Sequence, residues 1–281
     1  KIGVGNRPIA WAVLFLMDNA LAARLAQTVR AADPDRYFAS LFAPAPDRPH
    51  LHALYAFNHE VAHVAESVRE PMLGAIRLEW WRETAEGAAK GAPRNHDVAR
   101  GLAAMFAERP VSLPALEAII AARAFDSDSG QFADFAALET YLDATGGALM
   151  RLAAQIVGGD PGVAREPALA YGLAGLLRSL PFHNRRHKLY LPLDLLAALK
   201  LTPDEFFVLE NDPRIGAAVR QTALRARDHF LAARRGPRPR AALAAILPAA
   251  LVPVYLRRMN KDVPVHRRQM ALLSAAMKKR L

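Results

Sequence analysis

Cysteine is absent from the 281 residues of the chain. Without a thiol, the protein cannot form a disulfide framework, hold an iron–sulfur cluster or thiolate-bound zinc, or use a cysteine nucleophile. Internal repeats, low-complexity tracts and alternating β-branched segments are also lacking. Apolar residues nevertheless make up 52% of the chain, which excludes a disordered or collagen-like protein and predicts a large buried core.

Acidic residues are scarce relative to basic ones, because 27 Asp and Glu stand against 37 Lys and Arg and leave a formal charge of +10. Such a surface attracts nucleic acid, anionic lipid or diphosphate, unless the charge serves only solubility. The excess lies late in the chain, over residues 214–240 and 257–280. Aromatic residues do not alternate with these arginines and no helix-turn-helix or RNA-binding signature is present, so nucleic acid is not expected as a partner.

The apolar run at residues 9–17 is too short to span a bilayer. Lys1 and Arg7 precede it, as in a signal peptide, but no clear small-residue cleavage site follows. We expect residues 1–16 to be a leader or a segment foreign to the native protein, and residues 17–281 to form one domain.

The remainder of the chain predicts one helix after another, since Ala and Leu are abundant and Pro and Gly divide the segments. A helix end or kink is expected at Pro181, which cannot donate a backbone hydrogen bond. The fold class is therefore all-α. Expected helices cover about 18–32, 49–69, 71 to between 87 and 91, 95–108, 113–124, 133–157, 164–180, 212–234, 240–259 and 264–280, with short helices after 192.

The residues His59-Glu60-Val61-Ala62-His63 match the zincin pattern His-Glu-x-x-His. On a helix both imidazoles share a face and could bind zinc while the glutamate acts as base, with Glu66 as a further oxygen ligand. The pattern is loosely specified, and no third ligand on a neighbouring element can be named. A zinc protease is thus a remote alternative, and we expect weak zinc binding or none.

Two further segments stand out. In residues 70–82, Leu73, Arg77, Trp80 and Trp81 fall at helical spacing, which we interpret as a packed aromatic face. In residues 176–192, basic and imidazole groups crowd into positions 183–188 beside Pro181. That basic loop either binds phosphate or is a solvated turn.

These segments, in this order, resemble the squalene/phytoene synthase family from about Asp33 to the C-terminus. The tract 38–66, with Leu54-Tyr55-Ala56-Phe57, is similar to the family's first signature, and the tract 178–192, which ends in Tyr190-Leu191-Pro192, is similar to its second. The middle segment with Tyr141 and Thr145-Gly146-Gly147 is also similar. The resemblance implies a single-domain, isoprenoid-synthase-type helical bundle around a central cavity.

Active members of this family join two prenyl diphosphates head to head and need two aspartate-rich motifs on facing helices. Carboxylates three or four residues apart share a helix face and can hold Mg²⁺, which neutralises the departing diphosphate. The resemblance therefore implies that residues 59–66 and 172–180 face each other across the cavity.

This sequence departs from the family pattern where the metal would bind. Ala62 and His63 stand at the paired aspartate positions of the first motif, Ser179 and His183 at those of the second, and only Glu66 stays acidic. On the same two faces, His59 stands where arginine is usual, and Gly172 and Gly175 replace the usual Gln and Asn. Imidazole is a poor ligand for Mg²⁺, so we expect no catalytic residue at these positions and no cofactor.

Several family positions are retained, and the resemblance implies that they bind substrate or another anion. Without aspartates and Mg²⁺, their positive charge at the cavity mouth would stay uncompensated and would attract a phosphate or an acidic partner. The expected set is Tyr55, Arg178, Arg185, Arg186, Lys188 and Tyr190.

The substituted residues have a resemblance of their own. Residues 56–64, 67–70 and 177–194 look like a divergent branch of the family whose eukaryotic member is the mitochondrial complex I assembly factor with a squalene/phytoene synthase-like domain. The resemblance implies a non-catalytic protein in respiratory complex I assembly, peripheral on the inner membrane, cytoplasmic in a bacterium or on the matrix side in a mitochondrion. Complex I subunits or intermediates, an anionic membrane surface and a prenyl lipid or diphosphate are the implied partners.

Two alternatives remain open. The first is an active Mg²⁺-dependent head-to-head prenyl diphosphate transferase, for which Glu60, Glu66, Asp126 and Asp128 are the nearby acids. The second is a non-catalytic binder of an isoprenoid lipid such as a quinone, which would reuse the cavity. The sequence does not separate this binder from an assembly factor.

Overall fold

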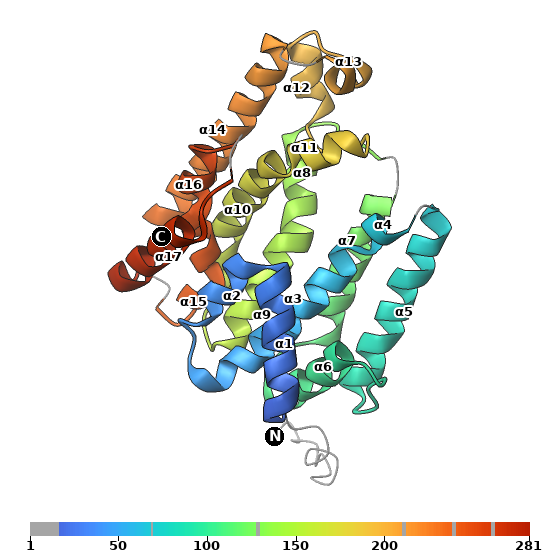
Figure 1. Cartoon of the computed structure of the whole chain (residues 1–281), viewed down its shortest axis with the longest axis vertical. Coiled ribbons are helices and arrows are strands. Elements are labelled where there is room, and N and C mark those ends of the chain that lie inside the picture. The colour runs from blue at the N-terminus through green and yellow to red at the C-terminus, as the bar shows by residue number, and fades with distance from the viewer. Residues whose placement is uncertain (1–16, 69, 128–129, 210–211, 238–239, 260–261) are drawn as a thin grey trace, which may run out of the picture.

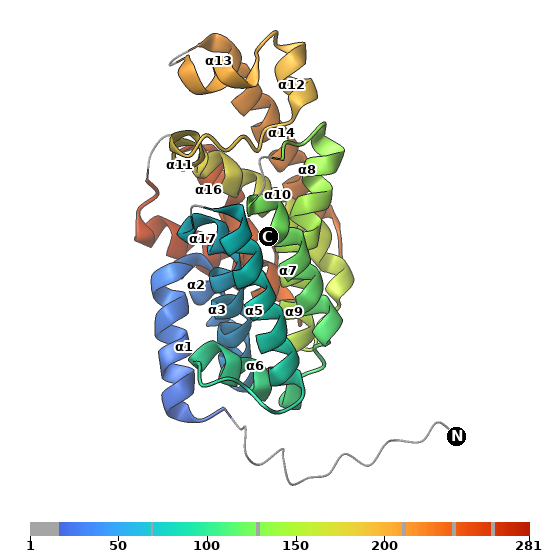
Figure 2. The ribbon, with the colours of Figure 1, turned by 90° about the vertical axis from the view of Figure 1, so that its right-hand side faces the viewer.

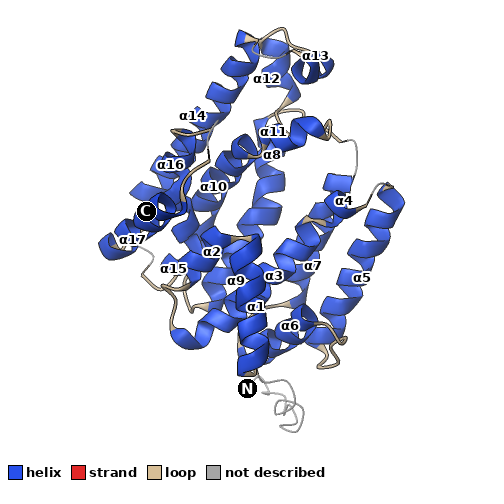
Figure 3. Ribbon diagram, in the orientation of Figure 1, coloured by secondary structure: helices blue, strands red, loops and turns tan. Residues whose placement is uncertain are grey.

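The computed structural model describes residues 17–68, 70–127, 130–209, 212–237, 240–259 and 262–281. Within these ranges the chain forms helices and no strand, which confirms the all-α prediction (Figure 3). The expectation for residues 1–16 lies outside the described residues.

The helices follow one another with short connections, and most match the expected ranges to within a few residues. In chain order they are α1 (Asn19–Ala32), α2 (Pro34–Ser40), α3 (Arg48–Ala62), α4 (Val64–Ser67), α5 (Pro71–Ala89), α6 (Asp97–Glu108), α7 (Leu113–Ser127), α8 (Phe135–Leu142), α9 (Ala148–Ile156), α10 (Arg165–Arg178), α11 (Leu180–Arg185), α12 (Leu193–Ala198), α13 (Pro203–Val208), α14 (Pro213–Arg235), α15 (Leu243–Ile246), α16 (Val252–Leu256) and α17 (Val265–Lys278).

The bundle has α3 at the centre of its N-terminal half, where every residue from His50 to Phe57 is buried. This helix packs against α1, α6 and α9, while α10 packs along α14 in the C-terminal half. The helices α12 and α13 stand at the far end of α14, away from the rest of the bundle (Figures 1 and 2). In the described part of the chain, no helix combines the length and the apolar character that a membrane span requires.

The short helix α2 was not expected from the sequence, and it matters for the site. Asp33 accepts a hydrogen bond from the backbone nitrogen of Arg36 at 3.0 Å, and Pro34 occupies the first turn. An aspartate cap followed by proline is a recognised helix start, but a helix of seven residues is too short to show clear apolar periodicity. This helix positions Asp35 and Arg36.

Three expected helices are not continuous α-helices. The helix predicted at 49–69 stops at Ala62 and resumes at Val64, because His63 leaves helical geometry with φ −92° and ψ 1°. The segment 240–259 divides into α15, a 3₁₀ turn at Leu247–Leu251 and α16, since Pro248 and Pro253 remove backbone donors. The segment 133–157 stays helical, but a π-helical turn at Asp143–Gly147 joins α8 to α9.

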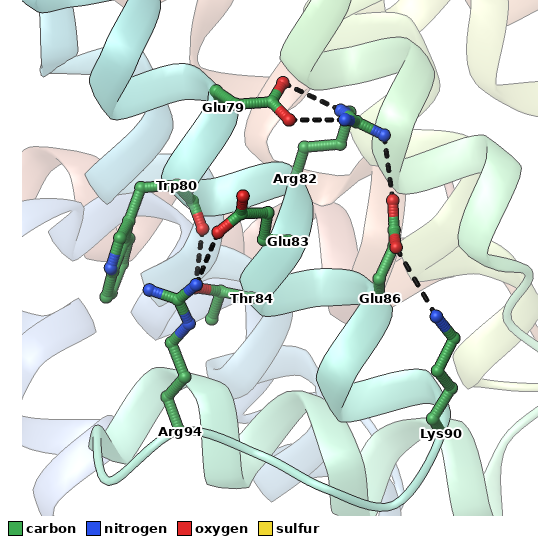
Figure 4. A network of polar contacts seen from close by, with 8 residues as sticks. All are labelled: Glu79, Trp80, Arg82, Glu83, Thr84, Glu86, Lys90 and Arg94. Carbon is green, nitrogen blue, oxygen red and sulfur yellow. Dashed lines mark hydrogen bonds and ion pairs between the residues drawn. The ribbon is translucent and has the colours of Figure 1, made fainter.

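The outer surface of α5 carries a ladder of paired charges (Figure 4). Arg82 donates to Glu79 and, at 2.8 Å, to Glu86, whose other oxygen lies 3.5 Å from the Lys90 amine. Such pairs three and four residues apart support an exposed helix by a few tenths of a kcal/mol each, about 0.2–0.5.

The aromatic face expected on this helix is only partly present. Trp81 is buried and its ring lies 5.9 Å from that of Phe57, whereas Leu73 and Arg77 are exposed. The side of α5 that carries Leu73 therefore faces outward and does not join the core.

Acid should destabilise the fold, and the buried His52 is one identifiable cause. Ser40 donates its only hydroxyl proton to the carbonyl of Tyr37, so His52 must donate from Nε2 to the Ser40 oxygen at 2.8 Å. Burial, with the Arg48 charge nearby, lowers the pKa of His52 from 6.5 to about 4. The unfolded chain therefore binds more protons between these values, and stability falls as pH drops through that window.

Between pH 6.5 and pH 4 the wild-type protein loses unfolding free energy, and His52 accounts for on the order of 3 kcal/mol of that loss. We expect His52→Gln to lose that much less over the same pH range. Urea unfolding at several pH values measures this slope. The exposed His187→Gln serves as control and should keep the wild-type slope. An unchanged slope in the His52 variant would show that His52 does not contribute to it.

Candidate functional site

A cavity of about 260 Å³ lies between the two motif segments and is lined by α3 and α4 on one side and by α10 and α11 on the other. Figure 1 shows how these helices are arranged. The helices α7 and α8 and the π-helical turn complete the wall. The facing arrangement of residues 59–66 and 172–180 that the resemblance implied is thus what the structure shows. The residues that line the cavity are Arg36, Ala62, His63, Ala65, Glu66, Arg123, Asp126, Tyr141, Leu142, Thr145, Gly146, Tyr171, Gly172, Gly175, Leu176, Phe182, His183, Arg186, Lys188 and Tyr190.

The first motif reaches the cavity through the helix break at His63. The imidazole Nδ1 of His63 lies 2.8 Å from the carbonyl oxygen of His59, and its Nε2 lies 3.6 Å from the carboxylate of Glu66. Ala62 and Glu66 also line the cavity, whereas Glu60 lines a separate pocket of about 480 Å³ between this segment and α5.

The two histidines of the zincin pattern lie side by side, with ring centroids 4.0 Å apart. Burial lowers the pKa of His59, and the neighbouring His63 lowers it further. Among the residues that the structure describes, no three His, Asp or Glu side chains are arranged as a metal site. Weak zinc binding or none remains the prediction.

The second motif enters where α10 gives way to α11. The helix α10 ends at Arg178, three residues before Pro181, and α11 carries His183 into the cavity wall. This break confirms the one expected at Pro181. Burial lowers the pKa of His183, although the carboxylate of Asp126 opposes that shift. The His183 ring lies 4.6 Å from that of Tyr190.

Asp126 is the buried carboxylate of the cavity, and its oxygens are already engaged. One oxygen accepts hydrogen bonds from Tyr141 at 2.5 Å and from Tyr190 at 3.0 Å, and the other from Arg123 at 3.1 Å. Burial raises the pKa of both phenols. This network fixes the three side chains in place and leaves Asp126 little capacity for another ligand. Asp128 lies outside the described residues.

The cavity wall carries more positive than negative charge. Its carboxylates are Glu66 and Asp126, and its cations are Arg36, Arg123, Arg186 and Lys188. The guanidinium of Arg186 donates to the backbone carbonyl of Glu66 at 2.9 Å, which ties the second motif to the first.

Arg178 does not line this cavity. Its guanidinium lies 3.5 Å from the buried carboxylate of Asp35 and 4.4 Å from the centre of the Tyr255 ring. Asp35 also accepts from Arg268 at 2.8 Å, from Tyr171 at 3.1 Å and from Tyr255. The expectation that Arg178 stands unpaired at the cavity mouth does not hold, because its guanidinium lies outside the cavity lining and beside Asp35, which it shares with Arg268.

Other expected site residues also lie away from the cavity. Tyr55 is fully enclosed, and its phenol oxygen has no hydrogen-bond partner among the described residues. Arg185 is exposed on α11, and Ser179 forms the junction of α10 and α11 outside the lining.

From the sequence, no role was assigned to Arg36 or Tyr171, which line the cavity together. Arg36 donates to Asp33 at 2.5 Å, and its guanidinium lies 5.3 Å from the centre of the Tyr171 ring. The cap-and-proline signature at Asp33 could have indicated the helix that presents Arg36. Nothing in the sequence indicated that Tyr171, 135 positions away, lies beside it.

The residues present do not fit the Mg²⁺ that the fold family implies. Mg²⁺ requires a near-octahedral set of oxygen ligands. Glu66 is the one carboxylate on the two motif segments that faces the cavity, and the oxygens of Asp126 are held by Arg123 and two phenols. The facing positions hold an alanine and two imidazoles, which supply no oxygen.

An all-helical bundle whose two motif segments face a central cavity defines an isoprenoid-synthase-type protein. The structure superposes on a crystal structure of a dehydrosqualene synthase in complex with ligand with a TM-score of 0.77 at 16% identity, over 97% of this chain and 98% of that chain. Residues 29–274 match the family described as Squalene/phytoene synthase. The chain therefore belongs to the squalene/phytoene synthase family.

Two curated relatives of similar sequence identity to this chain have different functions. The bovine protein "NADH dehydrogenase (ubiquinone) complex I, assembly factor 6" is 27% identical over 241 residues, which cover 84% of this chain and 72% of the relative. The presqualene diphosphate synthase of Rhodopseudomonas palustris is 28% identical over 204 residues, which cover 70% of this chain and 72% of that enzyme.

Proposed function

We propose that this chain is a non-catalytic member of the squalene/phytoene synthase family that acts in the assembly of respiratory complex I at the inner membrane. The observation that carries the proposal is the replacement at both facing motifs. Ala62 and His63 on one side and Ser179 and His183 on the other stand where the family resemblance places metal-binding aspartates. A cavity without those carboxylates lacks the means to hold Mg²⁺ on a departing diphosphate.

The similarity to the complex I assembly factor supports the same proposal. It extends over more of this chain than the similarity to the presqualene diphosphate synthase, at nearly the same identity. An active transferase would instead need Glu66 and Asp126 to do the work of the missing aspartates, although Asp126 is committed to Arg123, Tyr141 and Tyr190.

The cavity itself favours a second function, the binding of a prenyl lipid without turnover. Its wall combines apolar side chains, Leu142, Leu176 and Phe182, with the guanidinium of Arg186. An apolar chain with an anionic or polar head would match that combination. A lipid bound in the cavity would be compatible with a role in complex I assembly, since a protein partner would bind to the outer surface and not in the cavity.

Deletion of the gene in its own organism should lower the amount of fully assembled complex I, while other respiratory complexes keep their levels. Blue-native electrophoresis and NADH:quinone oxidoreductase activity measure both quantities. The wild-type gene and a Glu66→Gln variant should restore assembly equally, because the proposal assigns no chemistry to the remaining motif carboxylate.

Two results would contradict the proposal in different ways. Normal complex I after deletion would remove the assembly role. Failure of a folded Glu66→Gln protein to restore complex I would instead point to carboxylate chemistry in the cavity and favour the transferase.

A further inference from the structure

The last helix, α17, has an apolar outer face as well as an apolar inner one. Leu272 and Ala275 are buried against the bundle. Met270, Leu273 and Met277 are 62%, 41% and 75% exposed, respectively. Their spacing of three and four residues places them in one stripe along the helix. This stripe, Met270, Leu273 and Met277, is called the α17 stripe below.

The charged side chains of α17 itself and of the residues after it are all of one sign. Residues 265–281 contain no Asp or Glu. The helical period places Arg267 and Lys278 along one edge of the stripe, and Lys279 and Arg280 follow its end. In the described part of the chain, none of these four cations lies within 4.0 Å of a carboxylate, while the inward-facing Arg268 pairs with Asp35.

A small cavity extends this positive region from α17 to the end of α14. Arg234, Arg235 and Arg280 line a cavity of about 320 Å³, together with the backbone around Gly236. No Asp or Glu contributes to its lining. Two segments that are distant in the sequence therefore bring three guanidinium groups together beside the C-terminal end of the stripe.

The interaction of basic residues with the α17 helix dipole does not explain this surface. Basic residues at a helix C-terminus stabilise the last turn, which would explain Lys278 and its neighbours. It does not explain why three large apolar side chains face outward over the length of the helix. A second copy of the chain does not suit the stripe either, because it would bring two acid-free, positively charged faces together.

A second exposed apolar group, on α5, provides a contrast. Met72 and Ile76 are 70% and 60% exposed, yet the outer surface of that helix continues into the paired Glu79, Arg82 and Glu86 of Figure 4. An apolar group beside balanced charges has no preference for an anionic surface. An apolar stripe bordered only by cations is typical of helices that lie in the interface of anionic membranes.

We propose that α17 lies flat on an anionic lipid surface. The α17 stripe would insert at the boundary between the headgroups and the acyl chains, and Arg234, Arg235 and Arg280 would face lipid phosphates. This inference rests on the part of the proposed function that places the protein at a membrane, and it names the surface that makes the contact. It differs from contact through the basic loop at residues 183–188, which follows the C-terminal end of α10 and is not part of α17.

Flotation of the purified chain with lipid vesicles tests the inference. Binding to phosphatidylcholine vesicles that contain phosphatidylglycerol should exceed binding to pure phosphatidylcholine vesicles. It should weaken as salt rises past about 0.1 M, where charges more than about 10 Å apart are screened. Replacing the stripe by serine (Met270→Ser, Leu273→Ser and Met277→Ser together) should lower the partition coefficient about tenfold or more.

Matched controls separate the α17 surface from the rest of the molecule. Arg235→Glu with Arg280→Glu should abolish the preference for anionic vesicles. Arg185→Glu with Arg220→Glu makes the same charge change at exposed positions of α11 and α14 and should bind as wild type does. Met72→Ser with Ile76→Ser removes apolar side chains from α5 and should also leave binding unchanged. Circular dichroism checks each fold, and Met277→Ser alone, at a highly exposed position, keeps the test valid if the triple variant unfolds.

Binding that survives the stripe and Arg235/Arg280 variants, or that is lost only in the Arg185/Arg220 variant, would overturn the assignment to α17. Absence of binding to either vesicle type would overturn the lipid surface altogether. Because this assay uses purified protein and the complex I readout is made in cells, failure of one inference is distinguishable from failure of the other.

Discussion

Purified protein supplied with Mg²⁺ and farnesyl or geranylgeranyl diphosphate should form no condensation product. Diphosphate departs only when its developing negative charge is stabilised, and removing a single stabilising group typically slows an enzyme by a factor of about 10²–10³. Here four motif positions that the family resemblance assigns to aspartate hold Ala62, His63, Ser179 and His183. The combined loss should place turnover below detection.

Product analysis by mass spectrometry, with an active family member as positive control, measures this outcome. Native mass spectrometry on the same samples reports whether the diphosphate binds. Binding without product supports the lipid-binding function. If neither binding nor product is observed, only the assembly role remains. Metal-dependent product would refute the non-catalytic proposal, and its disappearance in Glu66→Gln would then identify Glu66 as a metal ligand.

Asp35→Asn should strongly destabilise the fold. The Asp35 carboxylate is 3% exposed and is shared by Arg178, Arg268, Tyr171 and Tyr255, which come from α10, α17 and α16. An asparagine keeps the shape but removes the charge, and so leaves two guanidinium groups without their counter-charge. Leaving a buried charge unpaired costs about 3–5 kcal/mol, and because the Arg178 side chain is 45% exposed we expect a loss at the lower end, about 3 kcal/mol.

For a chain of this size, that loss corresponds to a fall in Tm of about 10 °C. Thermal and urea unfolding measure it. Asp97→Asn is the matched control, because Asp97 also pairs with an arginine, Arg24, but its side chain is 42% exposed. We expect the control to lose less than about 1 kcal/mol. Equal stability of the two variants would show that the Asp35 cluster does not hold α17 to the bundle.

The location of α17 links this prediction to the membrane surface. Arg268 is the residue by which α17 reaches Asp35, and Leu272 and Ala275 continue the contact along the inner face. Weakening this attachment should therefore disturb the helix that carries the stripe. The Asp35 variant is for that reason unsuitable as a probe of vesicle binding, and the substitutions on the exposed face are preferred.

Local patterns determined the helical class and most helix positions. Ala- and Leu-rich segments divided by Pro and Gly have few alternatives to helices, and Pro181 marked the end of α10 because a missing backbone donor acts within its own turn. The same local reasoning did not find the break at His63, where the residue itself is compatible with a helix. It also missed α2, whose seven residues are too few for periodicity to appear.

The residue types at the two motifs were likewise evident from the sequence, since a resemblance aligns positions and shows which carboxylates are replaced. That alignment suggested a cavity mouth with free positive charge. It did not reveal that Asp35 pairs with Arg178 or that Asp126 is held by Tyr141 and Tyr190. Each partner lies at least 15 positions from the residue it contacts.

The sequence by itself determined the fold class, the family resemblance and the loss of the motif aspartates, because all three depend on residue identity and spacing along the chain. Only the tertiary structure decided which charges remain available. A guanidinium is an anion site or a closed ion pair according to whether a carboxylate from another helix lies beside it. That is why Arg178 is paired with Asp35, while Arg234, Arg235 and Arg280 meet beside the apolar stripe of α17 with no Asp or Glu in their lining.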